Sequence, residues 1–115
     1  MPIVQVVFHI DESVKWGLLL KNVSNLLHEV DLNASQIEVV ANAEAVEFYT
    51  VKTSSEHTTL AANLAEAGVK FAACSNALRD RGISEQELDP FVLVVPAGVL
   101  ELAQRQKEGY AYIKP

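Results

Sequence analysis

The side chain with the clearest chemical potential is the single cysteine, Cys74. It follows the apolar run 69–73, which predicts a buried strand, and it precedes a predicted helix at about 76–81. Free backbone N–H groups and the positive end of a helix dipole favour a thiolate over a thiol at such a position. Cys74 is therefore either a reactive nucleophile or a small buried apolar residue, and its position alone leaves both interpretations open.

The residues around Cys74 exclude several kinds of cysteine chemistry. A phosphatase loop needs an arginine six residues after the cysteine to hold phosphate, but Asp80 occupies that position and would repel the anion. There is no second cysteine for a redox pair. His9 falls on a predicted strand, and His28 and His57 fall on predicted helices, so none of the three is visibly placed to act as a base for the thiol.

Polar residues follow the predicted strands at the positions where open parallel sheets bind ligands, beyond the carboxyl ends of the strands. The candidate ligand-binding residues at these positions are Asp11, Asn42, Ser75, Asn76 and Pro96. We expect them to converge with Cys74 on one edge of the domain. Asn22 and Asn25 share a face of the first predicted helix, where they serve either a ligand or hydrogen bonds within or between subunits.

No cofactor or metal site is expected. The segment after the first predicted strand is acidic, whereas a flavin-phosphate loop would be rich in Ser, Thr and Gly. A phosphorylatable receiver domain would need an aspartate at the end of a central strand, where Asn42 and Cys74 stand instead. His, Cys and Asp residues lack metal-ligand spacing, and no glycine-rich nucleotide loop occurs.

The elements that must position these residues alternate between strand and helix. Short apolar runs predict buried strands at residues 3–10, 37–41, 69–73, 91–95 and 111–113. Apolar residues at three- and four-residue steps between Val14 and Val30 predict the first helix, and we interpret segment 43–49 as a short helix. Strands alternating with helices predict a layered α/β sandwich with right-handed crossovers, formed by a single domain over residues 1–115.

Residues at the helix ends carry capping signals. Asp11 or Ser13 is expected to cap the first helix, and Thr53 and Glu56 have capping-box spacing before a helix that stops at Gly68. These signals place the starts of the first two long helices.

The last third of the chain carries similar signals. Ser84 and Glu87 repeat the capping-box spacing before a short turn. Pro96 is expected at the first position of the last helix, and Gly109 just past its end. These residues predict that the last helix connects the strands at 91–95 and 111–113.

The composition of the chain limits the classes of binding partner and the cellular compartment that we expect. The chain has 115 residues and a formal net charge of −6, with 15 acidic and 9 basic side chains. Nucleic acid and anionic membrane surfaces are therefore not expected as partners, because both are bound largely through Lys and Arg. The apolar N-terminus lacks the basic region of a signal peptide, and no run is long enough to span a membrane. We expect a cytoplasmic protein whose single thiol is reduced.

Six blocks of sequence together are similar to the DsrE/DsrF-like family, and the similarity covers nearly the whole chain. The blocks are residues 7–11, 22–27, 39–42, 71–78, 94–99 and 109–113. This resemblance implies a three-layer α/β/α sandwich around a mainly parallel five-stranded sheet, of flavodoxin-like type, which agrees with the pattern of the residues. It also places Ala43 where many relatives have glycine.

The resemblance implies a function for Cys74. Well-studied members of the family carry sulfur as a cysteine persulfide in a relay between proteins, and Cys74 matches their cysteine. The chain is thus expected to be a sulfur carrier or sulfurtransferase-like protein with sulfur donor and acceptor proteins as partners and no cofactor. The alternative is a non-catalytic oligomeric binding module in which Cys74 is structural.

Because members of this family form oligomers, the resemblance also implies a homo-oligomer, either a trimer or a hexamer. Trp16 and Leu20 extend the apolar surface of the first helix beyond one stripe, and Tyr110 and Tyr112 share a face of the last strand. Aromatic residues are favoured at interfaces. These four side chains are therefore the expected interface residues, with the alternative that Trp16 caps the core.

Overall fold

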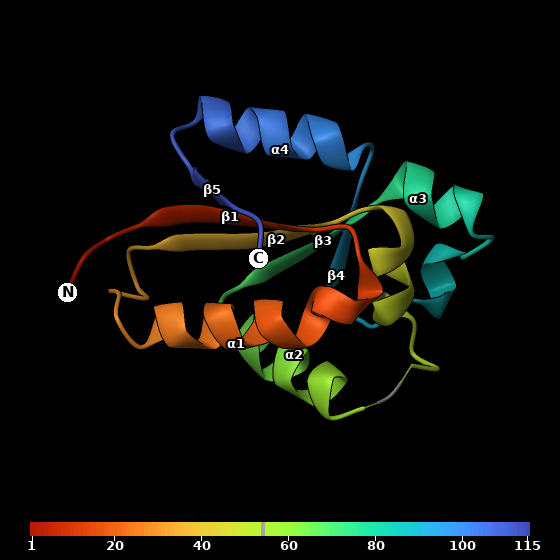
Figure 1. Ribbon diagram of the computed structural model, residues 1–115, viewed down its shortest axis with the longest axis horizontal. Helices are drawn as coiled ribbons and strands as arrows, with labels where there is room; N and C mark the ends of the chain where they lie inside the picture. The colour runs from red at the N-terminus through yellow and green to blue at the C-terminus, as the bar shows by residue number, and fades with distance from the viewer. Residues whose placement is uncertain (54) are drawn as a thin grey trace.

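The computed structural model describes residues 1–53 and 55–115 and contains a single five-stranded sheet in the order β4-β3-β2-β1-β5 (Figure 1). All four pairs of neighbouring strands are parallel. The strands are β1 (Gln5–Ile10), β2 (Gln36–Ala41), β3 (Lys70–Cys74), β4 (Val92–Val95) and β5 (Ala111–Ile113). Each of the predicted strand runs is thus confirmed to within a few residues.

Helices cover both faces of this sheet and complete the predicted three layers. Figure 1 shows α1 and α2 on one face and α4 on the other, with α3 near the β3 and β4 side. The long helices are α1 (Trp16–Leu27), α2 (Glu56–Glu66) and α4 (Gly98–Lys107), and α3 (Ser75–Asp80) is shorter. Three 3-10 helices, η1 (Ser13–Lys15), η2 (Ala43–Tyr49) and η3 (Glu85–Glu87), lie between them. Over the described residues, no helix is long and apolar enough to cross a membrane.

The larger part of the core lies between the sheet and the α1/α2 layer. Trp16 is 2% exposed, stacks on Phe48 with ring centroids 4.3 Å apart, and donates from Nε1 to the carbonyl of Ala45 at 3.0 Å. Leu20 is fully buried in the same cluster. The prediction that Trp16 and Leu20 lie at a subunit interface is therefore wrong, because α1 turns both side chains inward.

A smaller apolar cluster lies under α4. Its buried residues are Val7, Val40, Ala72 and Leu102. Side chains alternate between the two faces along each strand, so neighbours of these positions face α1 and α2 instead. Tyr110 packs against this cluster from the connection into β5. The α4 layer thus buries far less apolar surface than the α1/α2 layer.

The start of the first helix differs from the prediction. Residues 13–15 form η1 before α1 begins at Trp16, and neither helix has a side-chain cap. The Asp11 carboxylate pairs with Lys114 at 3.3 Å, and the Ser13 hydroxyl donates to the Glu44 carbonyl at 3.2 Å. Both predicted caps are wrong because their side chains have other partners.

The N-cap of the second long helix lies two residues later than the predicted capping residue, Thr53. Ser55 is the N-cap of α2, and its hydroxyl accepts the backbone N–H three residues on at 3.3 Å. The Thr53 hydroxyl instead donates to the Glu47 carbonyl of η2 at 3.3 Å. The predicted box of Thr53 and Glu56 is therefore wrong, and Ser54 within it lies outside the described residues.

In the last third of the chain, two of the three residues or motifs predicted to start or end a helix are confirmed. The Ser84 N–H donates to the Glu87 carboxylate at 3.1 Å in a capping box. Gly109 follows α4 with a φ of 97°, a left-handed conformation that favours glycine. Pro96 is not the first residue of the helix, because the residue after it stays extended with a φ of −151° and α4 starts at Gly98.

Candidate functional site

Cys74 is the last residue of β3 and the residue from which α3 begins, as its sequence context predicts. It lies beside Val95 of β4 in the sheet register and is 7% exposed. The chain turns from strand to helix here with no intervening loop. The thiol therefore lies at the carboxyl edge of the sheet, where open parallel sheets place ligands.

The first residue of α4 lies directly against Cys74 and Asn42. A β-carbon on Gly98 would come within 3.3 Å of the Cys74 β-carbon and 3.2 Å of the Asn42 β-carbon. Such contacts are tighter than most real β-carbon contacts, so a larger residue here would have to push its neighbours away by a few tenths of an ångström. Pro96 lies two residues earlier, exposed on the connection from β4. Of the predicted site residues, Asn42 is the one that shares with Cys74 the close approach to Gly98.

Asn42 is also the end of a hydrogen-bonded row that crosses three strands. The His9 Nε2 lies 3.0 Å from Asn42 Oδ1, and the His9 Nδ1 lies 2.6 Å from the Tyr112 hydroxyl. His9 is on β1 and Tyr112 on β5, two strands that neighbour each other in the sheet. Sequence reasoning set His9 aside as a base and took Tyr112 for an interface residue, although the alternation of β1 puts His9 on the α4 side.

The other predicted site residues are held by charged partners. Arg79 on α3 donates to the Asn76 side-chain oxygen and reaches the Ser75 hydroxyl at 3.5 Å. The Asp11 carboxylate is paired with Lys114. These groups lie near the same edge, but their hydrogen-bonding capacity is partly used. Among the described residues, no three His, Cys, Asp or Glu side chains gather closely enough to hold a metal ion.

Asn22 and Asn25 lie together on a different surface. With Phe8, Leu26 and Ile113 they line a groove of about 350 Å³ between α1 and the sheet edge at β5. The expectation that the two amides share one helix face is confirmed. Phe8 belongs to the core cluster on the α1/α2 side, so this groove opens on that face of the sheet.

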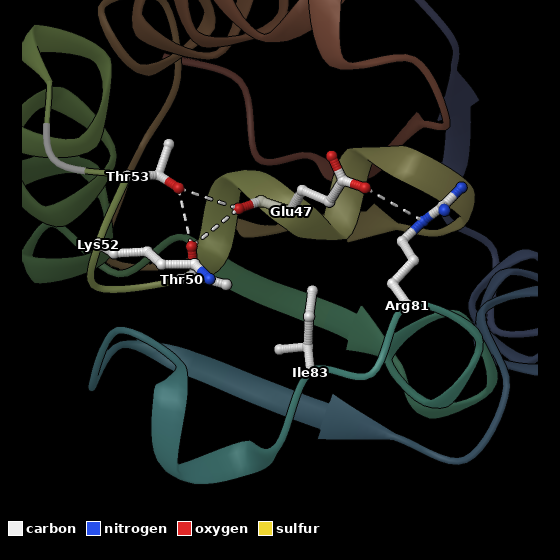
Figure 2. Close-up of a pocket in the computed structure, with 6 residues that line it drawn as sticks. All are labelled: Glu47, Thr50, Lys52, Thr53, Arg81 and Ile83. Carbon is white, nitrogen blue, oxygen red and sulfur yellow. Dashed lines mark hydrogen bonds and ion pairs between the residues drawn. The ribbon is translucent and has the colours of Figure 1, made fainter.

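Another hollow, of about 300 Å³, lies at the end of η2 and does not include Cys74 in its lining (Figure 2). Its lining residues are Glu47, Thr50, Lys52, Thr53, Arg81 and Ile83. The Thr50 and Thr53 hydroxyls lie 2.7 Å apart and both donate to the Glu47 carbonyl. Glu47 also pairs with Arg81 at 3.8 Å. These polar groups are occupied with one another, so the hollow offers few free partners for a ligand.

A buried charge cluster lies beneath α4. Glu38 on β2 is 5% exposed, and its carboxylate lies 3.7 Å from Arg105 Nε. Arg105 also approaches Glu101 at 3.6 Å and Glu108 at 2.7 Å. Burial, together with the neighbouring Glu101, raises the pKa of Glu38 to about 8, despite the opposing effects of Arg105 and Lys70. The signal for this cluster was one acidic residue inside a continuous apolar run.

Comparison with known proteins identifies relatives of the chain. The family model for the DsrE/DsrF-like family matches residues 3–115. The protein of unknown function MTH1491 from Methanobacterium thermoautotrophicum shares 39% identity at a TM-score of 0.88, over 97% of this chain and 99% of that one. A search of curated proteins found no match.

Two more distant solved structures have the same fold. The YchN protein from E. coli is 17% identical with a TM-score of 0.76, and the alignment covers 100% of both chains. The conserved protein of unknown function BT1422 from Bacteroides thetaiotaomicron is 14% identical with a TM-score of 0.69, over 96% of this chain and 94% of that one. The predicted α/β fold with its parallel sheet is thus confirmed by comparison.

Proposed function

The chain belongs to the DsrE/DsrF-like family, and we propose that it is an intracellular sulfur carrier that forms a persulfide on Cys74. The observation that carries the proposal is the position of Cys74 at the carboxyl edge of the sheet, against Asn42 and the first residue of α4. A nucleophilic thiol needs polar neighbours that tolerate negative charge on sulfur, and this edge supplies them.

The transfer is balanced without an oxidant or a reductant. The Cys74 thiolate attacks the outer sulfur of a donor persulfide, R–S–SH, and forms a new S–S bond to Cys74. The old S–S bond breaks, and its electron pair leaves with the donor as R–S⁻. An acceptor thiolate then attacks the outer sulfur on Cys74, which takes the sulfur away and restores the Cys74 thiolate.

The surroundings of Cys74 favour the charged states of this cycle. α4 has ten residues, so the N–H groups of its first turn carry the positive end of a helix dipole. Because Gly98 has no side chain, this helix start approaches Cys74 closely. The Asn42 amide adds a polar group on the same side. Negative charge on a thiolate or a persulfide sulfur is thereby stabilised.

Partners follow from the chemistry of a single thiol. With one cysteine in the chain, sulfur comes from a donor outside the chain and leaves to an acceptor outside it, and we propose that both are proteins. A reducing compartment such as the cytoplasm would keep Cys74 free for this role. The family resemblance further favours a homo-oligomer, a trimer or a hexamer, formed by surfaces other than the buried Trp16 and Leu20. No metal or organic cofactor takes part in the proposed cycle.

One observation favours a second candidate function. Cys74 is only 7% exposed, which suits a structural residue of a non-catalytic oligomeric binding module. In that case the carboxyl edge would bind a small ligand or a partner through its polar groups without covalent chemistry. The two functions differ in whether Cys74 reacts.

Intact-mass spectrometry after incubation with a sulfane-sulfur donor, such as inorganic polysulfide, separates the two functions. The sulfur carrier is expected to gain about 32 Da, the mass of one sulfur atom, and to lose it to dithiothreitol. Cys74→Ser should gain nothing. If the folded wild-type protein takes up no sulfur, the carrier function is wrong and the binding module is favoured.

A second variant tests whether the packing around Cys74 matters. Gly98→Ala places a methyl group against Cys74 and Asn42 and should slow sulfur uptake several-fold. Ala103→Ser, at an exposed position of the same helix, is the matched control and should react like the wild type. Equal uptake rates in all three proteins would contradict the proposed role of the helix start.

A further inference from the structure

We infer that His9, which is hydrogen-bonded to Tyr112, is a positioning residue for the Asn42 side chain. It holds the oxygen of the Asn42 amide, so that the N–H group of this amide remains available to the sulfur on Cys74. This inference rests on the proposed function of Cys74 and adds two residues to that site. Neither His9 nor Tyr112 contacts the reacting sulfur itself. Each acts through the next side chain in the row.

The four residues occupy neighbouring strands in order. Tyr112 is on β5, His9 on β1, Asn42 directly after β2, and Cys74 at the end of β3, and the sheet order is β4-β3-β2-β1-β5. The strand alternation puts Tyr112, His9 and Asn42 on the α4 side, since Tyr112 pairs with Val7, which is buried there. The row therefore runs along the carboxyl edge toward Cys74.

The hydrogen bonds of the row select one tautomer of His9. The Asn42 Oδ1 can only accept, so the His9 Nε2 at 3.0 Å must carry a hydrogen and donate it. In a neutral imidazole the Nδ1 then has no hydrogen and accepts from the Tyr112 hydroxyl at 2.6 Å. Tyr112 thereby stabilises the tautomer that holds the carbonyl end of the Asn42 amide.

The orientation of this amide decides its effect on Cys74. With Oδ1 bound to His9, the end of the amide that remains free is the Nδ2 group, which has two hydrogens to donate. The β-carbons of Asn42 and Cys74 both lie within 3.3 Å of the β-carbon position of Gly98. A nearby N–H donor stabilises an anionic sulfur, whereas a carbonyl oxygen would repel it. The opposite tautomer of His9 would turn the repelling end toward the thiol.

The first measurement is the tautomer of His9 in the wild-type protein, read from the ¹⁵N shifts of the imidazole and its long-range couplings. The expected result is a single neutral tautomer with the hydrogen on Nε2. In Tyr112→Phe, which removes the hydroxyl, the two tautomers should mix. Tyr110→Phe is the matched control, because Tyr110 packs against the same small cluster and makes no bond to His9. An Nδ1–H tautomer in the wild type would overturn the inference.

The second measurement is the rate of Cys74 alkylation by iodoacetamide as a function of pH. Asn42→Asp keeps an oxygen for His9 but replaces the donor with a carboxylate, so alkylation at pH 7 should slow by about tenfold and its pH midpoint should rise. Tyr112→Phe should shift the profile in the same direction by less, and Tyr110→Phe should not shift it. A wild-type profile in both Asn42→Asp and Tyr112→Phe would overturn the inference.

Alkylation does not require persulfide formation, so the two proposals can fail separately. If the alkylation profile shifts as expected while polysulfide adds no mass, the sulfur-carrier function is wrong and the positioning row stands. If sulfur is taken up normally and neither the tautomer nor the profile responds to Tyr112→Phe, the positioning role is wrong and the carrier stands. Thermal unfolding of each variant checks that it is folded.

Discussion

The face of the sheet covered by α1 and α2 is packed with large apolar side chains, whereas the face under α4 combines a few apolar residues with buried charges. On the first face Trp16, Phe48 and Phe71 form part of an extended aromatic cluster. On the second, Leu102 is the buried leucine of α4, and Glu38 lies beside it in the layer with Arg105 above. The two faces differ in what holds the covering helix in place.

This difference separates stability from function. Burial of apolar surface is the dominant favourable term in folding, so the α1/α2 face contributes most of the free energy that holds the domain together. The residues of the candidate site lie at the carboxyl edge of the sheet, with His9, Asn42 and Tyr112 on the thinly packed α4 side and Cys74 between the large cluster and the start of α4. A thinly packed layer opens locally at a lower cost than the whole domain, which suits a buried thiol that must meet other proteins.

The largest expected effect comes from truncating one leucine on each face. Leu19→Ala on α1 removes a fully buried side chain from the large cluster and should cost about 4 kcal/mol of unfolding free energy. Leu102→Ala on α4, which is 6% exposed in the small cluster, should cost about 2–3 kcal/mol, because a thin layer collapses more easily around the gap. Urea denaturation measures both.

The same pair of variants tests whether α4 can open alone. Amide hydrogen exchange in Leu102→Ala should speed up in α4 while the β1–β3 amides stay protected, whereas Leu19→Ala should weaken protection throughout the domain. Equal losses of unfolding free energy, with uniform loss of protection in both variants, would contradict the contrast between the two faces.

A smaller effect, dependent on pH, is expected from Glu38→Gln. The folded protein raises the pKa of Glu38 to about 8, above its ordinary value of 4.5. The folded state therefore binds more protons than the unfolded state between these values, and the wild-type protein loses stability as pH rises from 4.5 to 8. Glu38→Gln cannot ionise and should escape this loss. Its advantage in unfolding free energy should grow by about 2–3 kcal/mol across that window, limited by the cost of undocking α4.

Glu108→Gln is the matched control for this prediction. Glu108 pairs with the same arginine at 2.7 Å, but its side chain is half exposed. Removing an exposed partner should change the unfolding free energy by less than about 1 kcal/mol at every pH. Denaturation curves at pH 5, 7 and 9 give the comparison. Parallel pH profiles for the wild type and Glu38→Gln would show that the charge cluster does not govern the α4 face.

Much of the fold was predictable because strand runs and helix periods are local signals. The predicted runs that end at Ala41 and Ala73 correspond to two neighbouring strands, and their parallel pairing brings Asn42 and Cys74 to one edge. Helix ends were predicted less well because a capping side chain such as Ser13 has competing partners that only the folded chain reveals. Segment 43–49 was predicted as a short helix and is η2, but the packing of Trp16 against it joins residues far apart in the chain and so was not predicted.

The site was predictable only in part because its hydrogen bonds join residues far apart in the chain. His9 and Tyr112 are 103 positions apart, and their contact follows from β1 and β5 being neighbours, which no local pattern states. Glu38 was hidden for a related reason. Its carboxyl lies near Arg105 and Glu101 of α4 only once the chain is folded, and burial there raises its pKa. Polar residues inside apolar runs are thus the signal that would have drawn attention to the α4 side.

The smallest expected effect is at Ala43, the first residue of η2, which directly follows Asn42 of the candidate site. Ala43 has a φ of 51°, a left-handed conformation that costs a residue with a β-carbon about 1–2 kcal/mol. Ala43→Gly removes this strain but adds freedom to the unfolded chain, so it should stabilise the protein by about 0.5–1 kcal/mol in urea denaturation. Ala45→Gly, at a buried position of η2, is the control and should destabilise by about 1 kcal/mol. A loss in both variants would mean that the turn after β2 carries no strain that glycine relieves.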